Sequence, residues 1–144
     1  MTRVEKLIKK LETEFGRNFN YLKDKLWAVN IFLDGNNRHQ MVYLKIREKK
    51  EGANDLSRFV CTSAIGPAEG LDLEVILRKN LALDIGTVAI EDLKNRDGLA
   101  VTYLIFKASH LAATADYAEI WELITKTATY ADKLEKELYS EDRH

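Results

Sequence analysis

The hydrophobic positions at the start of the chain follow the period of an α-helix. Apolar residues recur at spacings of three and four, at Val4, Leu7, Ile8, Leu11 and Phe15. Lysine and glutamate fill most of the positions between them, so one face is apolar and the rest is charged. This pattern predicts an amphipathic helix. We expect it to end at Gly16 and Asn18, because both residue types are common helix stops.

The period then changes to two, which is typical of strands. Alternating or apolar runs occupy residues 27–33, 41–47 and 59–65. The Asp-Gly-Asn-Asn sequence at 34–37 predicts a reversal between the first two runs, and the polar segment 49–55 predicts a second. The third run ends at Gly66 and Pro67. Three consecutive strands joined by short turns indicate an antiparallel meander.

The second half of the chain begins with a short helix and two more strands. Asp72 is a suitable N-cap for the helix, and Asn80 is expected to stop it. Apolar runs at 85–91 and 99–107 then predict two strands.

The last element is the longest helix of the chain. Asp116 and Glu119 have the spacing of a capping box, with Asp in place of Ser or Thr. Apolar positions then repeat at four and three over residues 117–138. The order is therefore helix, three strands, helix, two strands, helix. We interpret residues 1–144 as one α+β domain, in which residues 140–144 are expected to fray.

Several strands are apolar on both faces. Leu99, Val101, Tyr103 and Ile105 alternate with Ala100, Leu104 and Phe106. A sheet with one face in water normally alternates apolar and polar positions. The two terminal helices can cover one face, so we expect a second copy of the chain or a bound partner to cover part of the other.

Composition and charge argue against nucleic-acid binding and membrane binding. The chain has 144 residues, of which 22 are basic and 23 acidic, for a net charge of -1. With basic and acidic residues so nearly balanced, we expect no overall positive electrostatic potential that would attract nucleic acid or an acidic membrane surface. The first thirty residues contain neither the apolar core of a signal peptide nor a run long enough to span a membrane. We therefore expect a cytoplasmic protein.

Residues with catalytic or metal-binding chemistry are sparse. Cys61 is the only cysteine and is expected to be a small buried hydrophobe. His39, in a predicted turn, and the terminal His144 are expected to be solvated. No histidine has another histidine or a cysteine three or four residues away, so no metal or other cofactor is predicted. His110 lies near apolar sequence, and it is the centre of an alternative hypothesis, a small-ligand sensor or weak hydrolase that uses His110 and a nearby carboxylate.

The basic run from Lys45 to Lys50 is the best candidate for nucleic-acid contact. Glu48 interrupts it, and no aromatic ladder for base stacking accompanies it. We favour a charged outer strand that discourages edge-to-edge aggregation.

Three sequence stretches carry a family resemblance. They are Ser63-Ala64-Ile65-Gly66 at the end of the third strand, Leu77-Arg78-Lys79-Asn80 at the end of the short helix, and residues 128–135 (ATYADKLE) in the last helix. With the element order, they resemble the type III secretion chaperone-like fold and, within it, the YbjN-like bacterial family. The resemblance implies a twisted antiparallel sheet with the terminal helices on one face, a dimer formed near the middle helix, and apolar grooves that hold an extended client.

The sequence thus predicts a non-enzymatic, homodimeric protein-binding module, chaperone-like or regulatory, with an unidentified protein as client. Neither nucleic acid nor membrane is expected as a partner. The expected dimer interface is Leu73, Ile76, Leu77 and Leu83. The expected client contacts are Leu7, Leu11, Phe15, Phe19 and Tyr43.

Overall fold

A computed structural model describes residues 1–33 and 37–139 of the chain. The helices are α1 (Arg3–Phe15), α2 (Leu73–Arg78) and α3 (Tyr117–Tyr139), with 3-10 turns η1 (Gly16–Asn18) and η3 (Lys79–Ala82). The main strands are β1 (Phe19–Lys23), β2 (Leu26–Leu33), β3 (Arg38–Arg47), β6 (Arg58–Pro67), β7 (Thr87–Lys94) and β8 (Ala100–Leu111). A small hairpin consists of β4 (Lys50–Glu51) and β5 (Asn54–Asp55). The expected α+β class is confirmed.

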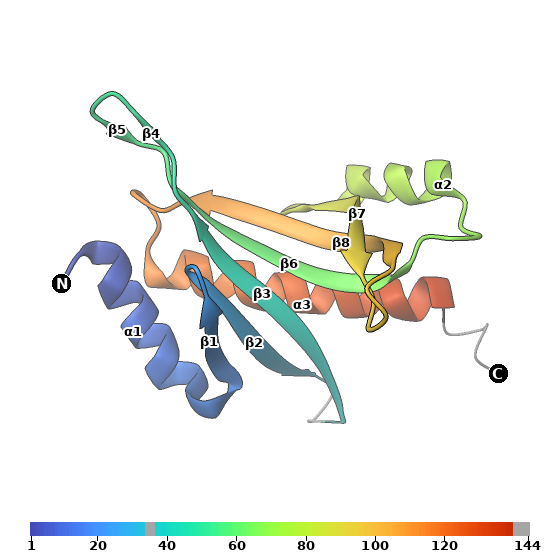
Figure 1. Cartoon of the computed structure of the whole chain (residues 1–144), viewed down its shortest axis with the longest axis horizontal. Helices are drawn as coiled ribbons and strands as arrows, with labels where there is room; N and C mark the ends of the chain where they lie inside the picture. The colour runs from blue at the N-terminus through green and yellow to red at the C-terminus, as the bar shows by residue number, and fades with distance from the viewer. Residues whose placement is uncertain (34–36, 140–144) are drawn as a thin grey trace.

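The six main strands form one antiparallel sheet in the order β1-β2-β3-β6-β8-β7. The β4–β5 hairpin joins β3 to β6 and projects from the body of the molecule (Figure 1). Both outer strands, β1 and β7, have one side without a neighbouring strand among the described residues. The sheet therefore presents two edges, one beside α1 and one beside α2 (Figure 1).

The helices pack on one face of the sheet. α3 runs the length of the molecule, whereas α1 and α2 lie at opposite ends (Figure 1). Alternate strand positions point toward α1 and α3 and form the core. The largest fully buried side chains include Phe59, Phe106, Leu11, Leu44, Leu104, Ile120 and Leu123. The opposite face of the sheet carries no helix in the part of the chain described.

Local sequence signals fix the ends of the helices. The Asp116 carboxylate accepts from the Glu119 amide at 2.8 Å, and the Glu119 carboxylate accepts from the Asp116 amide at 3.1 Å, so the predicted capping box is confirmed. Asp72 accepts from the Glu74 and Val75 amides and caps α2. Gly16 ends α1 with a φ of 56°, a conformation that glycine adopts without steric cost.

Three features differ from the pattern-based expectation. The first is β1, which adds a strand before β2 and was not predicted. The second is His39, which lies within β3 rather than in a turn, although it is exposed as expected. The third is Asn80, which does not stop a helix but binds the backbone of Val88 at the start of β7. Most of the reversal expected at 34–37, the fraying expected at 140–144 and the terminal His144 lie outside the described residues.

Candidate functional site

A groove of about 610 Å³ lies between the N-terminal half of α1 and the end of the sheet that carries β1 and β2. Val4 and Ile8 of α1 line one side, and Tyr21 of β1 and Trp27 of β2 line the other. The remaining apolar lining comes from Met1, Ile46 and Ala112. Aliphatic and aromatic side chains from three strands and one helix thus meet around a space that the chain itself does not fill.

Two sets of hydrogen bonds hold the first turn of α1 in place beside this groove. The Thr2 hydroxyl accepts from the Glu5 amide at 3.1 Å and caps the helix. The Arg3 guanidinium donates from Nε and Nη2 to the carbonyl of Ala115, just before α3. Farther along α1, Leu7, Ile8 and Leu11 pack into the core. The helix is therefore anchored at its first turn and along its inner face, and the groove lies beside it.

The second side of the groove belongs to the outer strand of the sheet. The Tyr21 ring meets the Trp27 ring edge-on with centroids 5.3 Å apart, and Tyr21 remains 60% exposed. Leu22, the next residue, is also exposed. The turn that returns the chain to β2 has positive φ at both Asp24 and Lys25. Tyr21 is the one residue of β1 in the lining, so the groove begins at the edge strand and runs from there across the ends of β2 and β3.

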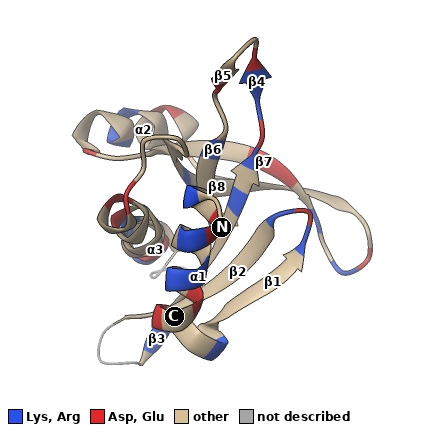
Figure 2. Cartoon of the chain, turned by 90° about the vertical axis from the view of Figure 1, so that its left-hand side faces the viewer, with Lys and Arg blue, Asp and Glu red and all other residues tan. Residues whose placement is uncertain are grey.

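Charged residues at the rim of the groove neutralise one another. Lys25 and Glu48 form an ion pair at 2.7 Å, and the hydrogen bond to Glu48 is the main cause that raises the pKa of Lys25. Hydrogen bonds from Ser57 lower the pKa of Asp55 in the β4–β5 hairpin. The hairpin and α1 both carry basic residues, and the hairpin carries acidic residues as well (Figure 2). The rim therefore favours neither a strongly acidic nor a strongly basic occupant.

A separate apolar patch lies on α2 and η3. Leu73, Val75, Leu77 and Leu81 are 40%, 52%, 56% and 87% exposed, respectively, and we call these four residues the α2 patch. Lys79 of η3 pairs with Glu137 of α3 at 3.3 Å, and Asn80 accepts from the Val88 amide at 2.7 Å. These contacts fix the short helix beside the edge strand β7. Ile76 points into the core, Leu73 and Leu77 lie on one side of it and Val75 on the other, and the Glu74–Arg78 ion pair lies on the outer side of the helix.

The structure corrects most of the residues predicted to contact a client. Leu7, Leu11 and Phe19 are buried in the core, because the sheet covers the apolar face of α1. Phe15 is partly buried, with its ring stacked on that of Phe19 at 6.3 Å. Tyr43 is exposed but lies on the opposite face of the sheet. The five residues do not form one surface.

Of the four residues predicted for the dimer interface, two are buried or partly buried and two are exposed. Ile76 is 2% exposed and belongs to the core, and Leu83 is partly buried against it. Neither can contribute much surface to a partner. Leu73 and Leu77 are exposed members of the α2 patch.

The expected client contacts do not include Tyr21 and Trp27, the aromatic side chains that line the groove. Tyr21 and Trp27 face each other because β1 pairs with β2, and the segment between them contains no glycine, asparagine or proline to signal the turn. Val75 and Leu81 of the α2 patch were also missed. Val75 lies within the predicted short helix, between Leu73 and Leu77, whereas Leu81 lies beyond the expected helix end at Asn80.

His110 forms a pair with Glu119 at the start of α3. Its Nε2 lies 2.7 Å from the Glu119 carboxylate, and its Nδ1 lies 2.9 Å from the carbonyl oxygen of Leu111. Both partners are hydrogen-bond acceptors, so this arrangement stabilises the imidazolium form, in which each ring nitrogen donates. The bond to Leu111 is the main cause that raises the pKa of His110, and the Glu119 carboxylate raises it further. In that form the ring links β8 to the start of α3 through the Glu119 carboxylate, and both ring nitrogens are engaged within the chain.

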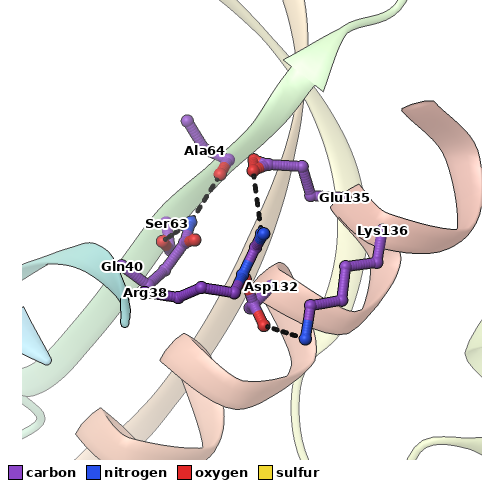
Figure 3. A network of polar contacts seen from close by, with 7 residues as sticks. All are labelled: Arg38, Gln40, Ser63, Ala64, Asp132, Glu135 and Lys136. Carbon is purple, nitrogen blue, oxygen red and sulfur yellow. Dashed lines mark hydrogen bonds and ion pairs between the residues drawn. The ribbon is translucent and has the colours of Figure 1, made fainter. Parts of the chain in front are cut away.

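A second polar network lies under the far end of α3 (Figure 3). The Arg38 guanidinium donates to the buried Asp132 carboxylate at 3.0 and 2.8 Å, and Lys136 pairs with the same carboxylate at 3.3 Å. Beside it, the buried Gln40 amide donates to the Ser63 hydroxyl and to the carbonyl of Ala64, both at 2.8 Å (Figure 3). The network ties β3 and β6 to α3, which is a structural role.

Cys61 is buried, as expected, and burial raises the pKa of its thiol. Among residues 1–33 and 37–139, no cluster of three or more His, Cys, Asp and Glu side chains could hold a metal ion. No helix in these segments has the length and apolar character needed to cross a membrane.

Comparisons with family models, with curated proteins and with solved structures give no match for this chain. The function proposed for the α1 groove and the α2 patch is therefore inferred from their residues and geometry.

Proposed function

We propose that the chain is a non-enzymatic, homodimeric protein-binding module that holds an extended segment of a partner protein, with a chaperone-like or regulatory effect. The observation that carries the proposal is the apolar groove between α1 and the β1 edge of the sheet. It combines two elements of peptide recognition, namely unpaired backbone groups and an apolar pocket beside them.

A partner segment in extended conformation suits this geometry. It would add to the sheet alongside Phe19–Lys23, where its backbone N–H and C=O groups pair with those of β1. In a strand, every second side chain points to the same face. Apolar side chains at alternate positions would therefore enter the groove between Ile8 and Trp27, and the others would face water.

The charge at the rim indicates the kind of segment. Because Lys25 and Glu48 neutralise each other, burial of apolar side chains supplies the affinity, at about 25 cal/mol per Å² before ordering costs. An uncharged, apolar strand is the occupant that this surface favours. Such segments are exposed in unfolded or newly made proteins, which is consistent with a chaperone-like role.

The α2 patch supports the homodimeric part of the proposal. Four exposed aliphatic side chains occur within residues 73–81, beside the edge strand β7, and Leu73 and Leu77 share one side of α2. Exposed apolar patches mark interaction sites on soluble proteins. A two-fold axis through the patch would bring it against its own copy and would leave the α1 groove at the other end free for a client.

The resemblance of the element order and of three sequence stretches to the type III secretion chaperone-like fold and the YbjN-like family supports the same reading. It implies a dimer near the middle helix and apolar grooves for an extended client. A cytoplasmic location is part of this proposal.

Peptide binding can be tested by selecting peptides that bind the protein from a library of short, tryptophan-free sequences. The Trp121→Phe variant leaves Trp27, in the groove, as the only tryptophan, so its emission reports occupancy of the groove. We expect enriched peptides to carry apolar residues at alternate positions and to shift this emission.

A charge introduced into the groove provides the matched comparison. Tyr21→Lys should weaken the selected peptides at least about tenfold, because it removes an aromatic wall and places an ammonium group there. Leu99→Lys adds the same charge at another exposed apolar position, on the β7–β8 loop, and should change nothing. Enriched peptides that bind the Tyr21→Lys variant as tightly as the unmodified protein would refute the groove as the binding site.

A further inference from the structure

The face of the sheet opposite the helices carries a second concave site, separate from the α1 groove. It is a depression of about 410 Å³ formed by β2, β3, β6, β7 and β8. Val60 and Ile105 lie on this uncovered face, yet they are only 7% and 5% exposed. The curvature of the sheet and the surrounding side chains therefore shield an apolar floor. A cavity of this volume matches a small organic molecule.

Basic side chains surround the floor. Lys45 and Arg47 come from β3 and Lys107 comes from β8, and all three line the depression. Arg58 of β6 lies directly opposite Arg47 in the antiparallel register. Along β6, Arg58 lies two residues to one side of Val60, and Thr62, which is opposite Lys107, lies two residues to the other side. The basic side chains therefore border the apolar floor from both ends.

These cations lack compensating charge. None of the four forms an ion pair with a carboxylate in the described parts of the chain, whereas Lys25, Lys49, Arg78, Lys79 and Lys126 all do. Glu91 is the one acidic residue among those that line the depression. Like charges directly opposite each other, such as Arg47 and Arg58, destabilise a sheet. An anion bound between the strands would offset this repulsion.

We propose that this depression binds a small organic phosphate with an apolar or aromatic body. The body would lie on Val60 and Ile105 and against the exposed ring of Tyr43, which lines the same space. The phosphate groups would lie among Lys45, Arg47 and Lys107. Three lining cations against one lining carboxylate suit a ligand with several negative charges better than a ligand with a single carboxylate. The bounded volume suits a free molecule better than a nucleic-acid strand.

Isothermal titration with four probes tests the proposal on the full chain. Adenosine diphosphate has both an aromatic body and two phosphate groups, adenosine has only the body, and pyrophosphate has only the charge. A single-stranded oligouridylate is the fourth probe. We expect adenosine diphosphate to bind at least about tenfold more tightly than adenosine or pyrophosphate. Its affinity should also exceed that of the oligonucleotide, counted per nucleotide.

Variants locate the site. Lys45→Gln and Lys107→Gln should each weaken adenosine diphosphate about tenfold, because each removes a charge-assisted contact to phosphate. Lys133→Gln removes an exposed lysine of α3 and should leave the affinity unchanged. Equal loss in the Lys133→Gln variant, or no binding of adenosine diphosphate at about 1 mM, would overturn the proposal. Tighter, steeply salt-dependent binding of the oligonucleotide would also overturn it.

Discussion

Replacement of Leu77 by alanine tests the proposed dimer. Leu77 is the central exposed leucine of the α2 patch and makes few contacts within its own chain, because 56% of its surface is exposed. The substitution removes apolar surface that would be buried against a second copy. It keeps a good helix former in α2, so the fold should be retained.

The magnitude follows from the exposed fraction of the side chain. Full burial of a leucine side chain contributes about 1.5–3 kcal/mol. Slightly more than half of Leu77 remains to be buried, so each copy would lose about 1 kcal/mol on substitution. In a symmetric dimer the residue occurs twice. The dimerisation free energy should therefore fall by about 2 kcal/mol, which is roughly a 30-fold increase in Kd.

Sedimentation equilibrium over a wide range of protein concentrations measures this change. Leu99→Ala is the matched control, since Leu99 is also an exposed leucine but lies at the other end of β7. Thermal unfolding monitored by circular dichroism should show that both variants keep their fold. A dimer whose Kd is the same with and without the Leu77 side chain would contradict the interface. A protein that stays monomeric at every concentration would contradict the dimer itself.

Three further predictions concern the fold around these surfaces. The pKa of His110 is raised in the folded protein, so its stabilising effect is fully present below the unfolded pKa and is lost as the pH rises through the folded value. The destabilisation caused by His110→Gln, measured by urea unfolding, should thus be about 1 kcal/mol at pH 5.5 and close to zero at pH 8.5; a loss independent of pH would contradict the imidazolium bridge. A Cβ added at Gly66 would lie 2.6–2.9 Å from the Tyr139 ring, so Gly66→Ala should cost about 1–3 kcal/mol of unfolding free energy, and an unchanged midpoint would show that the ring is not held there. The Cys61 thiol should resist Ellman's reagent in the native protein and react after unfolding, because burial keeps it protonated and out of reach; rapid reaction of the native protein would refute its burial.

Elements defined by local periodicity could be predicted from the sequence. Apolar spacing placed α1 and α3, and Asp72, Asp116 and Glu119 marked helix starts because caps form within one turn of the chain. The strand β1 was missed because the turn after it contains Asp24 and Lys25 at positive φ, where the usual signal is glycine or asparagine.

The site was harder to predict because exposure depends on packing between distant segments. Periodicity identified Leu7 and Leu11 as apolar, but it could not show that the sheet covers them. The role of Tyr21 also depends on the fold, since it lines the groove because the pairing of β1 with β2 places its ring against that of Trp27. The excess of apolar strand positions was recognised, yet the curvature that shields Val60 and Ile105 arises only in the folded sheet.

Hydrogen–deuterium exchange with a selected peptide is the most direct test of the proposed strand addition at β1. The amides of β1, Phe19–Lys23, form the edge of the sheet beside the groove. Addition of a strand at this edge predicts slower exchange at alternate β1 amides when the peptide binds, with unchanged exchange in β7 at the other edge. Unchanged exchange throughout β1, with protection at β7 or on the opposite face of the sheet, would contradict the account.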